Sequence, residues 1–384
     1  MKAVIQPSLA RGHVAAPPSK SYGHRLLIAS FLAKGGSITH LGTSKDIQAT
    51  QDCLKALSEK ANPLVLPCQE SGSTLRFMIP IALLQENEVI FTGSNRLFQR
   101  GLTPYFKIFD EQGISYSLEV EKLTVQGKLK PGLFRLEGGV SSQFITGLLF
   151  ALPLLEGDST VQIDGALESA PYVAMTIDVL SRFGVIVHRL DRGFFIPGKQ
   201  FYKPIDAVVE GDESNAAFLH ALNLLGGHVE VEGLNPNTIQ GDKVHLEFFE
   251  KLRDGHPIID LSNAIDLGPI CFGMAALLHG ATFTNIRRLR IKESDRVADM
   301  AEICRLFGAK TVEEENRIEI YPSTEKGPLG EIKVPNDHRL VMTTAVMLTT
   351  RGGTILGAEA VNKSYPNFFD DLRRLGVEVS LYEE

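Results

Sequence analysis

The stretch SKSYGHRLLIASFLAKGG (residues 19–36) opens with a polar cluster and continues as an apolar run of helical length. Five other stretches are built in the same way: SGSTLRFMIPIALLQEN (71–87), SSQFITGLLFALPLLEGD (141–158), DESNAAFLHALNLLGG (212–227), AIDLGPICFGMAALLHGA (264–281) and NDHRLVMTTAVMLTTRGG (336–353). A pattern that returns along the chain is the signature of a repeat architecture. The sequence therefore predicts six copies of one supersecondary unit.

Each copy continues in a similar order after its apolar helix. A short β-like run such as EVIFTG or HVEVEG comes next, followed by an amphipathic helix such as VADMAEICRLFGA. The longer copies then add two further β-like runs, so the unit reads βαβαββ. The polar clusters begin near residues 19, 71, 141, 212, 265 and 336. The first and fourth copies are shorter by about 18 residues, the length of one β-hairpin. This symmetry predicts an α/β (α+β) fold with two domains of three units each, units one and four being shortened.

Two segments mark where the chain is expected to pass from one domain to the other. They are the Pro-rich VAAPPSK (14–20) and the link PIDAVVEGDE (204–213). We expect one domain at 19–210 and the other at 1–18 plus 211–384. Because the chain then crosses twice, hinge closure is expected rather than free swivelling.

Composition narrows the kind of ligand. The 384 residues carry a net charge of −7, which argues against general nucleic-acid binding. Several Lys and Arg residues nevertheless stand inside the polar clusters, and this favours a small anion. The four cysteines lack the spacing of a disulfide framework or a zinc site. No signal peptide or membrane-length apolar run is evident, so we expect a cytoplasmic protein without metal or membrane partner.

The polar clusters are candidates for the binding site because helix N-termini favour anions. Taken singly, their Ser, Asp and Asn residues are read more simply as ordinary N-caps. The recurring cations that accompany them are not explained by capping. Two carboxylates stand among these cations: Asp266, expected to open an apolar helix, and Glu293, in a K-E-x-x-R face with Lys292 and Arg296. Desolvation would raise their pKa values and the cations would lower them, and the sequence leaves open which effect wins.

The motifs PPSKSYGHR, ESGSTLR, SSQF, ESAPY, VEGDESNAA, RIKESDR, NDHR and NKSYP, taken in this order, resemble those of the enolpyruvyl transferases. The resemblance spans nearly the whole chain and is closest to members that act on shikimate 3-phosphate. It implies a two-domain inverse α/β barrel of six βαβαββ units. It also implies transfer of the carboxyvinyl group of phosphoenolpyruvate to the 5-hydroxyl of shikimate 3-phosphate, with release of phosphate. The expected partners are these two small molecules, with no cofactor and no nucleic acid, and a monomer is expected.

The resemblance also implies a role for each matching residue. Those expected to hold shikimate 3-phosphate are Lys20, Ser21, Arg25, Ser141, Ser142, Gln143, Ser169, Tyr172, Asp266 and Lys292. Those expected to meet phosphoenolpyruvate are Lys20, Gly72, Arg100, Gln143, Arg296, Arg339 and Lys363. The expected catalytic residues are Lys20, Asp266 as the base for the attacking hydroxyl, and Glu293 as the group that exchanges protons with the methylene carbon. The implied reaction is a tetrahedral addition–elimination with no covalent enzyme intermediate.

Departures and alternatives remain. Glu70 and Arg288 stand where the family motifs often carry Asn. The sister enzyme that uses UDP-N-acetylglucosamine typically has a reactive Cys in a loop that here reads GSNRLFQRGLTPY (93–105), without Cys. Only Cys68, beside ESGSTLR, is placed to approach the site, and we expect catalysis to need no thiol. A non-catalytic anion- or RNA-end-binding module is a third reading, opposed by the two carboxylates and the acidic net charge.

Overall fold

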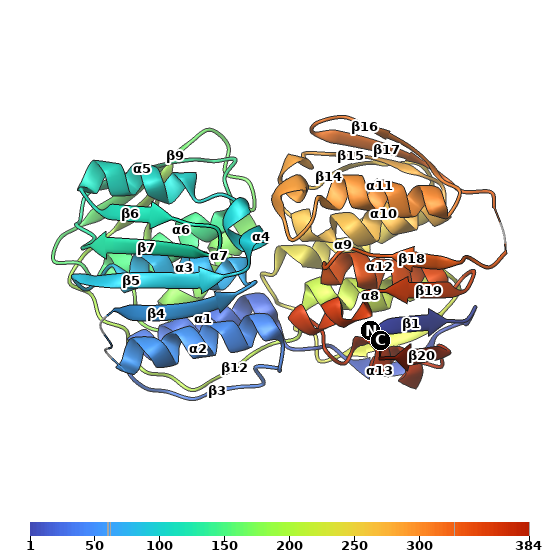
Figure 1. Cartoon of the computed structure of the whole chain (residues 1–384), viewed down its shortest axis with the longest axis horizontal. Coiled ribbons are helices and arrows are strands. Elements are labelled where there is room, and N and C mark those ends of the chain that lie inside the picture. Colours follow the sequence, from blue (N-terminus) through green and yellow to red (C-terminus); the bar gives the residue numbers. More distant parts are fainter. Residues whose placement is uncertain (60, 62, 326, 384) are drawn as a thin grey trace. The chain divides into compact units, whose positions relative to one another are not determined.

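The computed structural model describes residues 1–59, 61, 63–325 and 327–383. The chain divides into two compact units, here called unit 1 (Met1–Ser19 with Glu210–Glu384) and unit 2 (Lys20–Val209) (Figure 1). Both contain sheets and helices, so the predicted mixed α/β class is confirmed. Within the described residues, no helix has the length and apolar character that a membrane crossing requires.

Unit 2 contains two four-stranded sheets and one short parallel pair among its described residues. The first sheet has the order β4-β5-β7-β6, with β4 (Leu64–Gln69), β5 (Asn87–Gly93), β6 (Ser115–Leu118) and β7 (Lys122–Gly127). The second has the order β8-β9-β11-β10, with β8 (Leu133–Glu137), β9 (Ser159–Asp164), β10 (His188–Leu190) and β11 (Gly193–Ile196). The pair joins β3 (Ile38–Thr39) to β12 (Ala207–Val208). In each four-stranded sheet the first two strands are parallel and the other neighbours antiparallel.

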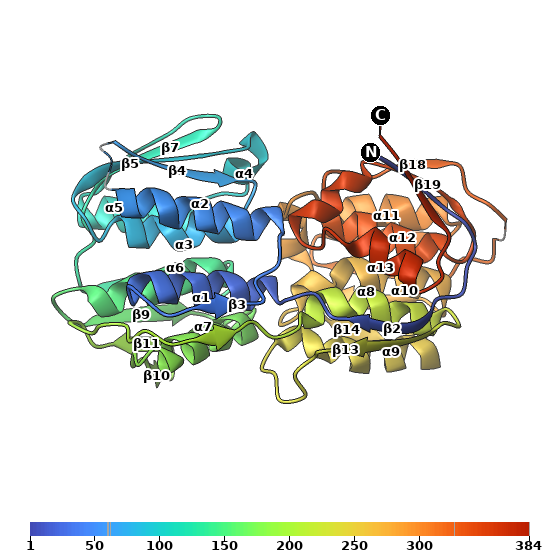
Figure 2. The same ribbon diagram turned by 90° about the horizontal axis from the view of Figure 1, so that it is seen from below.

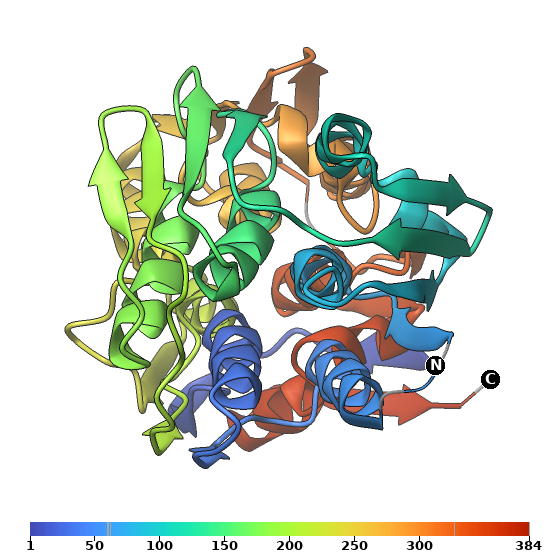
Figure 3. The ribbon, with the colours of Figure 1, turned by 90° about the vertical axis from the view of Figure 1, so that its left-hand side faces the viewer.

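The helices of unit 2 lie inside these sheets, as Figure 3 shows in a nearly end-on view. They are α1 (Lys20–Leu32), α2 (Lys45–Glu59), α3 (Gly72–Ala82), α4 (Asn95–Gln99), α5 (Thr103–Gln112), α6 (Ser142–Ala151), α7 (Ala170–Arg182) and the 3₁₀ turn η1 (Leu152–Leu154). α3 and α6 are buried almost throughout and pack against each other, which explains why their sequences are apolar around the whole helix (Figure 2).

Unit 1 repeats the same sheet plan. One sheet has the order β14-β15-β17-β16, with β14 (Ile258–Asp260), β15 (Ala281–Thr284), β16 (Lys310–Glu313) and β17 (Arg317–Tyr321). The other has the order β18-β19-β1-β20, with β1 (Lys2–Ile5), β18 (Glu331–Lys333), β19 (Gly353–Leu356) and β20 (Val379–Tyr382). A parallel pair joins β2 (Arg11–Ala15) to β13 (His228–Glu232). The N-terminal strand β1 thus lies between β19 and β20, which come from the end of the chain.

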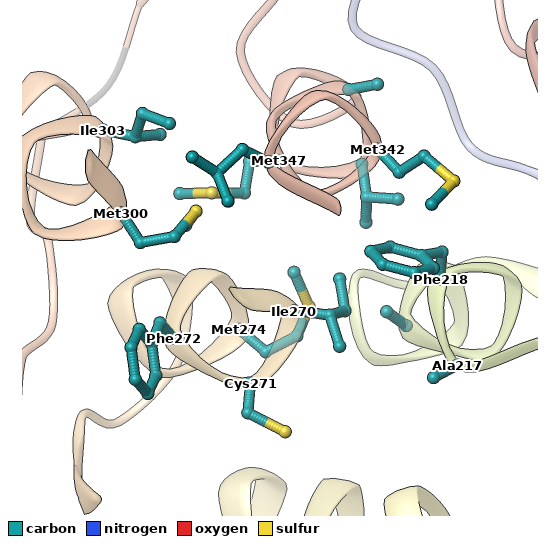
Figure 4. Packing of buried hydrophobic residues seen from close by; sticks show 14 of the residues in the cluster. Ala217, Phe218, Ile270, Cys271, Phe272, Met274, Met300, Ile303, Met342 and Met347 are labelled. Carbon is teal, nitrogen blue, oxygen red and sulfur yellow. The ribbon is translucent and has the colours of Figure 1, made fainter. Parts of the chain in front are cut away.

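The helices of unit 1 surround a sulfur-rich core. They are α8 (Glu213–Leu224), α9 (His245–Asp254), α10 (Gly268–Leu277), α11 (Arg296–Leu306), α12 (His338–Leu348) and α13 (Phe368–Arg374), with 3₁₀ turns η2 (Gly241–Val244), η3 (Ile265–Leu267), η4 (Arg287–Ile291) and η5 (Ala358–Lys363). Figure 4 shows side chains of α8, α10, α11 and α12 meeting in this core, among them Phe218, Met274, Met300, Met342 and Met347. Flexible Met side chains fill irregular gaps well, which suits the junction of four helices.

Several core helices begin at a polar side chain that caps them. Ser71, Ser141, Asp212 and Asp337 each accept a hydrogen bond from a backbone N–H in the first turn of α3, α6, α8 and α12 respectively. Such a cap satisfies one of the donors that a helix start leaves open. The capping interpretation of these four residues is therefore correct.

Candidate active site

A buried arginine organises the charged cluster of unit 1. Arg296 is the first residue of α11 and is only 1% exposed. Its guanidinium donates from Nε and Nη2 to the two oxygens of Asp337 (2.7 and 3.2 Å), a bidentate pair. It also donates from Nη1 to Asp266 (2.9 Å) and from Nη2 to Glu293 (2.7 Å). Charge-assisted bonds of this kind are strong and directional, so Arg296 holds three carboxylates in one arrangement.

Asp266 is surrounded by cations. Besides the Arg296 contact, its carboxylate lies 3.2 Å from Lys292 Nζ and 3.7 Å from Arg339 Nη2, and Arg339 Nη1 also donates to its backbone carbonyl (3.1 Å). Burial alone would raise the pKa of Asp266. The three cations outweigh burial and hold that pKa well below its usual range. The carboxylate is therefore ionised at neutral pH and available as a proton acceptor.

For Asp266, the electrostatic question that the sequence left open is thus decided by the cations around it. Three cations, Lys292, Arg296 and Arg339, face Asp266 at short range. Glu293 shares one of these cations, Arg296, with it. The carboxylates act on Arg296 in turn: burial would lower its pKa, and Asp337, Glu293 and Asp266 raise that pKa above its ordinary value.

The backbone places these residues differently from the sequence-based expectation. Asp266 was expected to open an apolar helix, but it lies in the 3₁₀ turn η3, and α10 begins at Gly268. The residues of the K-E-x-x-R face lie together, since Arg296 pairs with Glu293, and both Lys292 and Arg296 contact Asp266. Lys292 and Glu293 precede α11, and Arg296 is its first residue. The carboxylate and ammonium groups therefore meet through turns before helices rather than along one helix surface.

Lys363 lies in the 3₁₀ turn η5 and is 7% exposed. Its ammonium donates to the backbone carbonyl of Asn336 (2.6 Å), in the segment that leads into α12. Arg339 follows three residues after Asn336, and its backbone N–H donates to the capping carboxylate of Asp337 (3.0 Å). The start of α12 therefore brings Arg339 and Lys363 to the same short segment.

In unit 2, a glycine permits a close approach by an arginine. Gly72 begins α3, and a Cβ atom at this position would lie 2.6 to 2.8 Å from the guanidinium atoms of Arg100. Arg76, on the same helix, donates to Gln143 Oε1 (2.6 Å), and Gln143 Nε2 donates to Ser73 (2.9 Å). The start of α3, the start of α6 and the end of α4 thus meet in one polar cluster.

A second cluster of unit 2 joins α1 to α7 through a buried cation. Arg25 donates to Thr176 Oγ1 (2.9 Å), to the Tyr172 carbonyl (3.0 Å) and to the Ser21 carbonyl (2.8 Å). Burial lowers the pKa of Arg25 to about 10, so it remains charged at neutral pH. Ser169, just before α7, has a left-handed backbone with φ of 56°. Non-glycine residues rarely adopt this conformation, and such strain concentrates at functional positions.

Lys20 opens α1 and forms an ion pair of 2.8 Å with Asp46 of α2, both side chains being largely buried. Ser141 and Ser142 stand at the start of α6, where Ser141 accepts from the Gln143 backbone N–H (3.3 Å). The residues predicted for unit 2 therefore occupy the first two turns of α1, the first turns of α3 and α6, the residues around the start of α7, and the C-cap of α4.

Two carboxylates of these clusters escaped the sequence analysis. Asp337 was read only as part of NDHR, and Asp46 looks like an ordinary acidic residue in the first turn of a helix. Asp337 pairs with a residue 41 positions away and Asp46 with one 26 positions away. An Asp two residues before Arg339, at the start of an apolar helix pattern, was the available signal for Asp337, and Asp46 offered none.

The thiols lie apart from this chemistry. Cys68 was the cysteine expected to approach the site, but it is fully buried, with its Sγ 3.9 Å from Cys53 Sγ. Burial raises the pKa of Cys68 well above its ordinary value, and the contact with Cys53 adds to this. Across the part of the chain that the structure describes, no three His, Cys, Asp or Glu side chains are grouped as a metal site.

Comparison with known proteins agrees with the motifs. Residues 4–372 match the family model of EPSP synthase (3-phosphoshikimate 1-carboxyvinyltransferase). The 3-phosphoshikimate 1-carboxyvinyltransferases of Clostridium acetobutylicum and Clostridium kluyveri are each 41% identical to this chain, covering 98% of it and 97% of the relative.

Solved structures support the fold. An EPSP synthase from Acinetobacter baumannii superposes with a TM-score of 0.77 at 22% identity, covering 99% of this chain and 100% of that one. The enolpyruvyl transferase NikO from Streptomyces tendae gives a TM-score of 0.77 at 11% identity, covering 99% and 98%. With the family match over nearly its whole length and the relatives at 41% identity, the chain belongs to the EPSP synthase (3-phosphoshikimate 1-carboxyvinyltransferase) family.

Proposed function

We propose that the chain transfers the carboxyvinyl group of phosphoenolpyruvate to the 5-hydroxyl of shikimate 3-phosphate, yielding 5-enolpyruvylshikimate 3-phosphate and phosphate. The observation that carries this proposal is Asp266, a carboxylate kept ionised by three cations beside a second carboxylate, Glu293. Addition of an alcohol to an enol phosphate requires one group to take the hydroxyl proton and another to protonate the methylene carbon. Unit 1 carries both groups.

Asp266 is the proposed base. Its carboxylate takes the 5-hydroxyl proton as the oxygen bonds to the substituted carbon of phosphoenolpyruvate. Glu293 delivers a proton to the methylene carbon and takes one back when phosphate leaves and the double bond re-forms. The hydroxyl proton held by Asp266 leaves with the departing phosphate, so protons balance over the two steps and both carboxyl groups are regenerated. Lys292, 3.2 Å from Asp266, stabilises negative charge that develops on the reacting oxygens.

The proposed binding roles of unit 2 follow its two clusters. Arg25 and Tyr172, joined by a hydrogen bond, hold the ring of shikimate 3-phosphate together with Ser21 and Gln143. Its phosphate is assigned to Ser141, Ser142 and Ser169. Lys20 is assigned to both substrates, and its ammonium has three N–H donors, one of which bonds to Asp46.

The proposed phosphoenolpyruvate ligands come from both units: Lys20, Gly72, Arg100, Gln143, Arg296, Arg339 and Lys363. Gly72 matters because it lets the Arg100 guanidinium lie against the start of α3. Arg296 donates to three carboxylates, so phosphoenolpyruvate shares its guanidinium with Asp266, Glu293 and Asp337.

We propose the same assignment for the architecture. Units 1 and 2 are the two enolpyruvyl transferase domains, each an inverse α/β barrel of three βαβαββ units. The shared strand order of the four larger sheets supports this. So does the direct passage from α9, ending at Asp254, to β14, starting at Ile258, where a shortened fourth unit lacks its hairpin. A cytoplasmic monomer that binds no nucleic acid completes the proposal, and sedimentation analysis tests its oligomeric state.

The decisive experiment is an assay of phosphate release by the purified protein. Phosphate should appear only when shikimate 3-phosphate and phosphoenolpyruvate are both present, and proton NMR should show the enol ether product. A parallel reaction with UDP-N-acetylglucosamine should release none. Phosphate release with that sugar nucleotide, or none with shikimate 3-phosphate, would overturn the assignment.

A further inference from the structure

The two segments that carry the chain between the units run side by side as they leave unit 1. The Ser19 backbone N–H donates to the Glu210 carbonyl (2.8 Å), and the Asp212 N–H donates to the Pro17 carbonyl (2.8 Å). Gly211 stands at their bridge, where a Cβ atom would lie 2.6 Å from the Gly233 carbonyl oxygen. Both crossings are therefore fixed to each other within unit 1.

The Gln240 side chain bonds to both crossings and ties them to the body of unit 1. It is 6% exposed and stands just before η2. Its Oε1 accepts from Ser19 Oγ (3.1 Å) and from the Glu213 backbone N–H (3.2 Å). Its Nε2 donates to Glu210 Oε1 (2.6 Å) and to the Gly211 carbonyl (2.8 Å). A primary amide has two donors and two acceptor sites, and here all four are used.

The Glu210 carboxylate extends this network into the loop before Gln240. Its Oε1 also accepts from the Thr238 hydroxyl, and its Oε2 accepts from Asn235 Nδ2 (2.7 Å). Gln240 is thus held in its orientation by a residue of the second crossing while it holds a residue of the first. A fully satisfied buried polar network of this kind specifies one geometry, because each lost partner leaves a buried group unpaired.

This network reaches the residue that directly precedes α1. Ser19 is fully buried and held twice, by its backbone at Glu210 and by its hydroxyl at Gln240. The next residue is Lys20, which begins α1 and carries the ammonium assigned above to both substrates. We propose that Gln240 is a positioning residue for Lys20, acting through Ser19. This inference rests on the proposed function, because it assigns Gln240 a part in binding shikimate 3-phosphate without touching it.

The first test measures binding of shikimate 3-phosphate by calorimetry. Gln240→Ala should raise Kd about tenfold, since small misplacements of a positioned group are costly. The matched control is Gln200→Ala in unit 2, which removes another glutamine with three backbone hydrogen bonds, two to Ile186 and one to Pro197. It should lower the melting temperature to a similar degree and leave Kd unchanged. An unchanged Kd in Gln240→Ala, or an equal rise in Gln200→Ala, would overturn the proposal.

The second test separates positioning from general loosening. If Gln240 acts through Lys20, its removal from a Lys20→Ala protein should change Kd by less than about twofold, because interacting sites are not additive. If the losses of affinity caused by Gln240→Ala and Lys20→Ala are fully additive, the inference is wrong. Ser19→Ala, which deletes one hydroxyl, covers the case in which Gln240→Ala does not fold, and it should raise Kd in the same direction by about threefold. If Kd does not rise in Ser19→Ala, the inference is also refuted. Failure of the wild-type protein to bind shikimate 3-phosphate would instead count against the proposed function.

Discussion

Replacing Asp266 by Asn tests the proposed base most directly. The substitution keeps the size of the side chain and one oxygen that can accept from Arg296 Nη1, 2.9 Å away in the structure. It removes the proton-accepting carboxylate, so kcat should fall by about a hundredfold or more, a loss of roughly 2.7 kcal/mol in the transition state. Because Asn retains that acceptor, the Kd of shikimate 3-phosphate should change far less than kcat.

The same substitution has a predictable effect on stability. Three cations lose one of the carboxylates that face them, and a hydrogen bond to a charged group becomes neutral, which should cost about 1–3 kcal/mol of unfolding free energy at neutral pH. The folded pKa of Asp266 is below its unfolded value, so its stabilisation is present above the unfolded pKa of about 3.9 and is lost as pH falls through the folded value. The stability gap between wild type and variant should therefore shrink below about pH 4.

The assay combines steady-state phosphate release with urea unfolding, and Asp254→Asn serves as the matched control. Asp254 lies at the end of α9 with a side chain 73% exposed, so the same chemical change there should leave both kcat and stability near wild type. A kcat for Asp266→Asn within about threefold of wild type would remove Asp266 from the mechanism. A stability gap that persists unchanged into acid would refute the account of its pKa.

Three further outcomes follow from the described contacts. Asp337→Asn leaves the buried guanidinium of Arg296 without its bidentate partner. The free energy of unfolding, measured with urea, should therefore fall by about 3 kcal/mol. A fall below about 1 kcal/mol would contradict the central role of that pair. Burial raises the pKa of Glu213 to about 7, so the contribution of this group to stability decreases as pH rises from about 5 to 7. Glu213→Gln should therefore weaken the decrease of melting temperature over this pH range. A decrease that is the same in the variant and the wild type would exclude Glu213 as its source. Gly72→Ala places a methyl group against the Arg100 guanidinium. KM for phosphoenolpyruvate should therefore rise about tenfold or more, while the Kd of shikimate 3-phosphate stays constant. An unchanged KM would show that phosphoenolpyruvate binding does not depend on the position of Arg100 beside Gly72.

The family and the reaction class were readable from the sequence because the decisive residues stand in short motifs. Groups such as SKS, SSQ and NDHR come directly before apolar helices, and a helix start is a local feature set by neighbouring residues. Ser71 and Ser141 do cap α3 and α6, as the N-cap interpretation required. The mixed α/β class likewise follows from apolar helix and strand patterns that alternate along the chain.

The sequence alone determined which residues are present at the helix starts, and only the tertiary structure decided what those residues do to one another. Asp266 could not be assigned a charge state from its neighbours in the chain, because the cations that hold its pKa low come from Lys292, Arg296 and Arg339. Gln240 accepts a hydrogen bond from Ser19, 221 positions away in the sequence, and no local sequence pattern predicts that contact. Electrostatic and hydrogen-bond energies depend on distance in space and on burial, and both are fixed only when distant segments pack together.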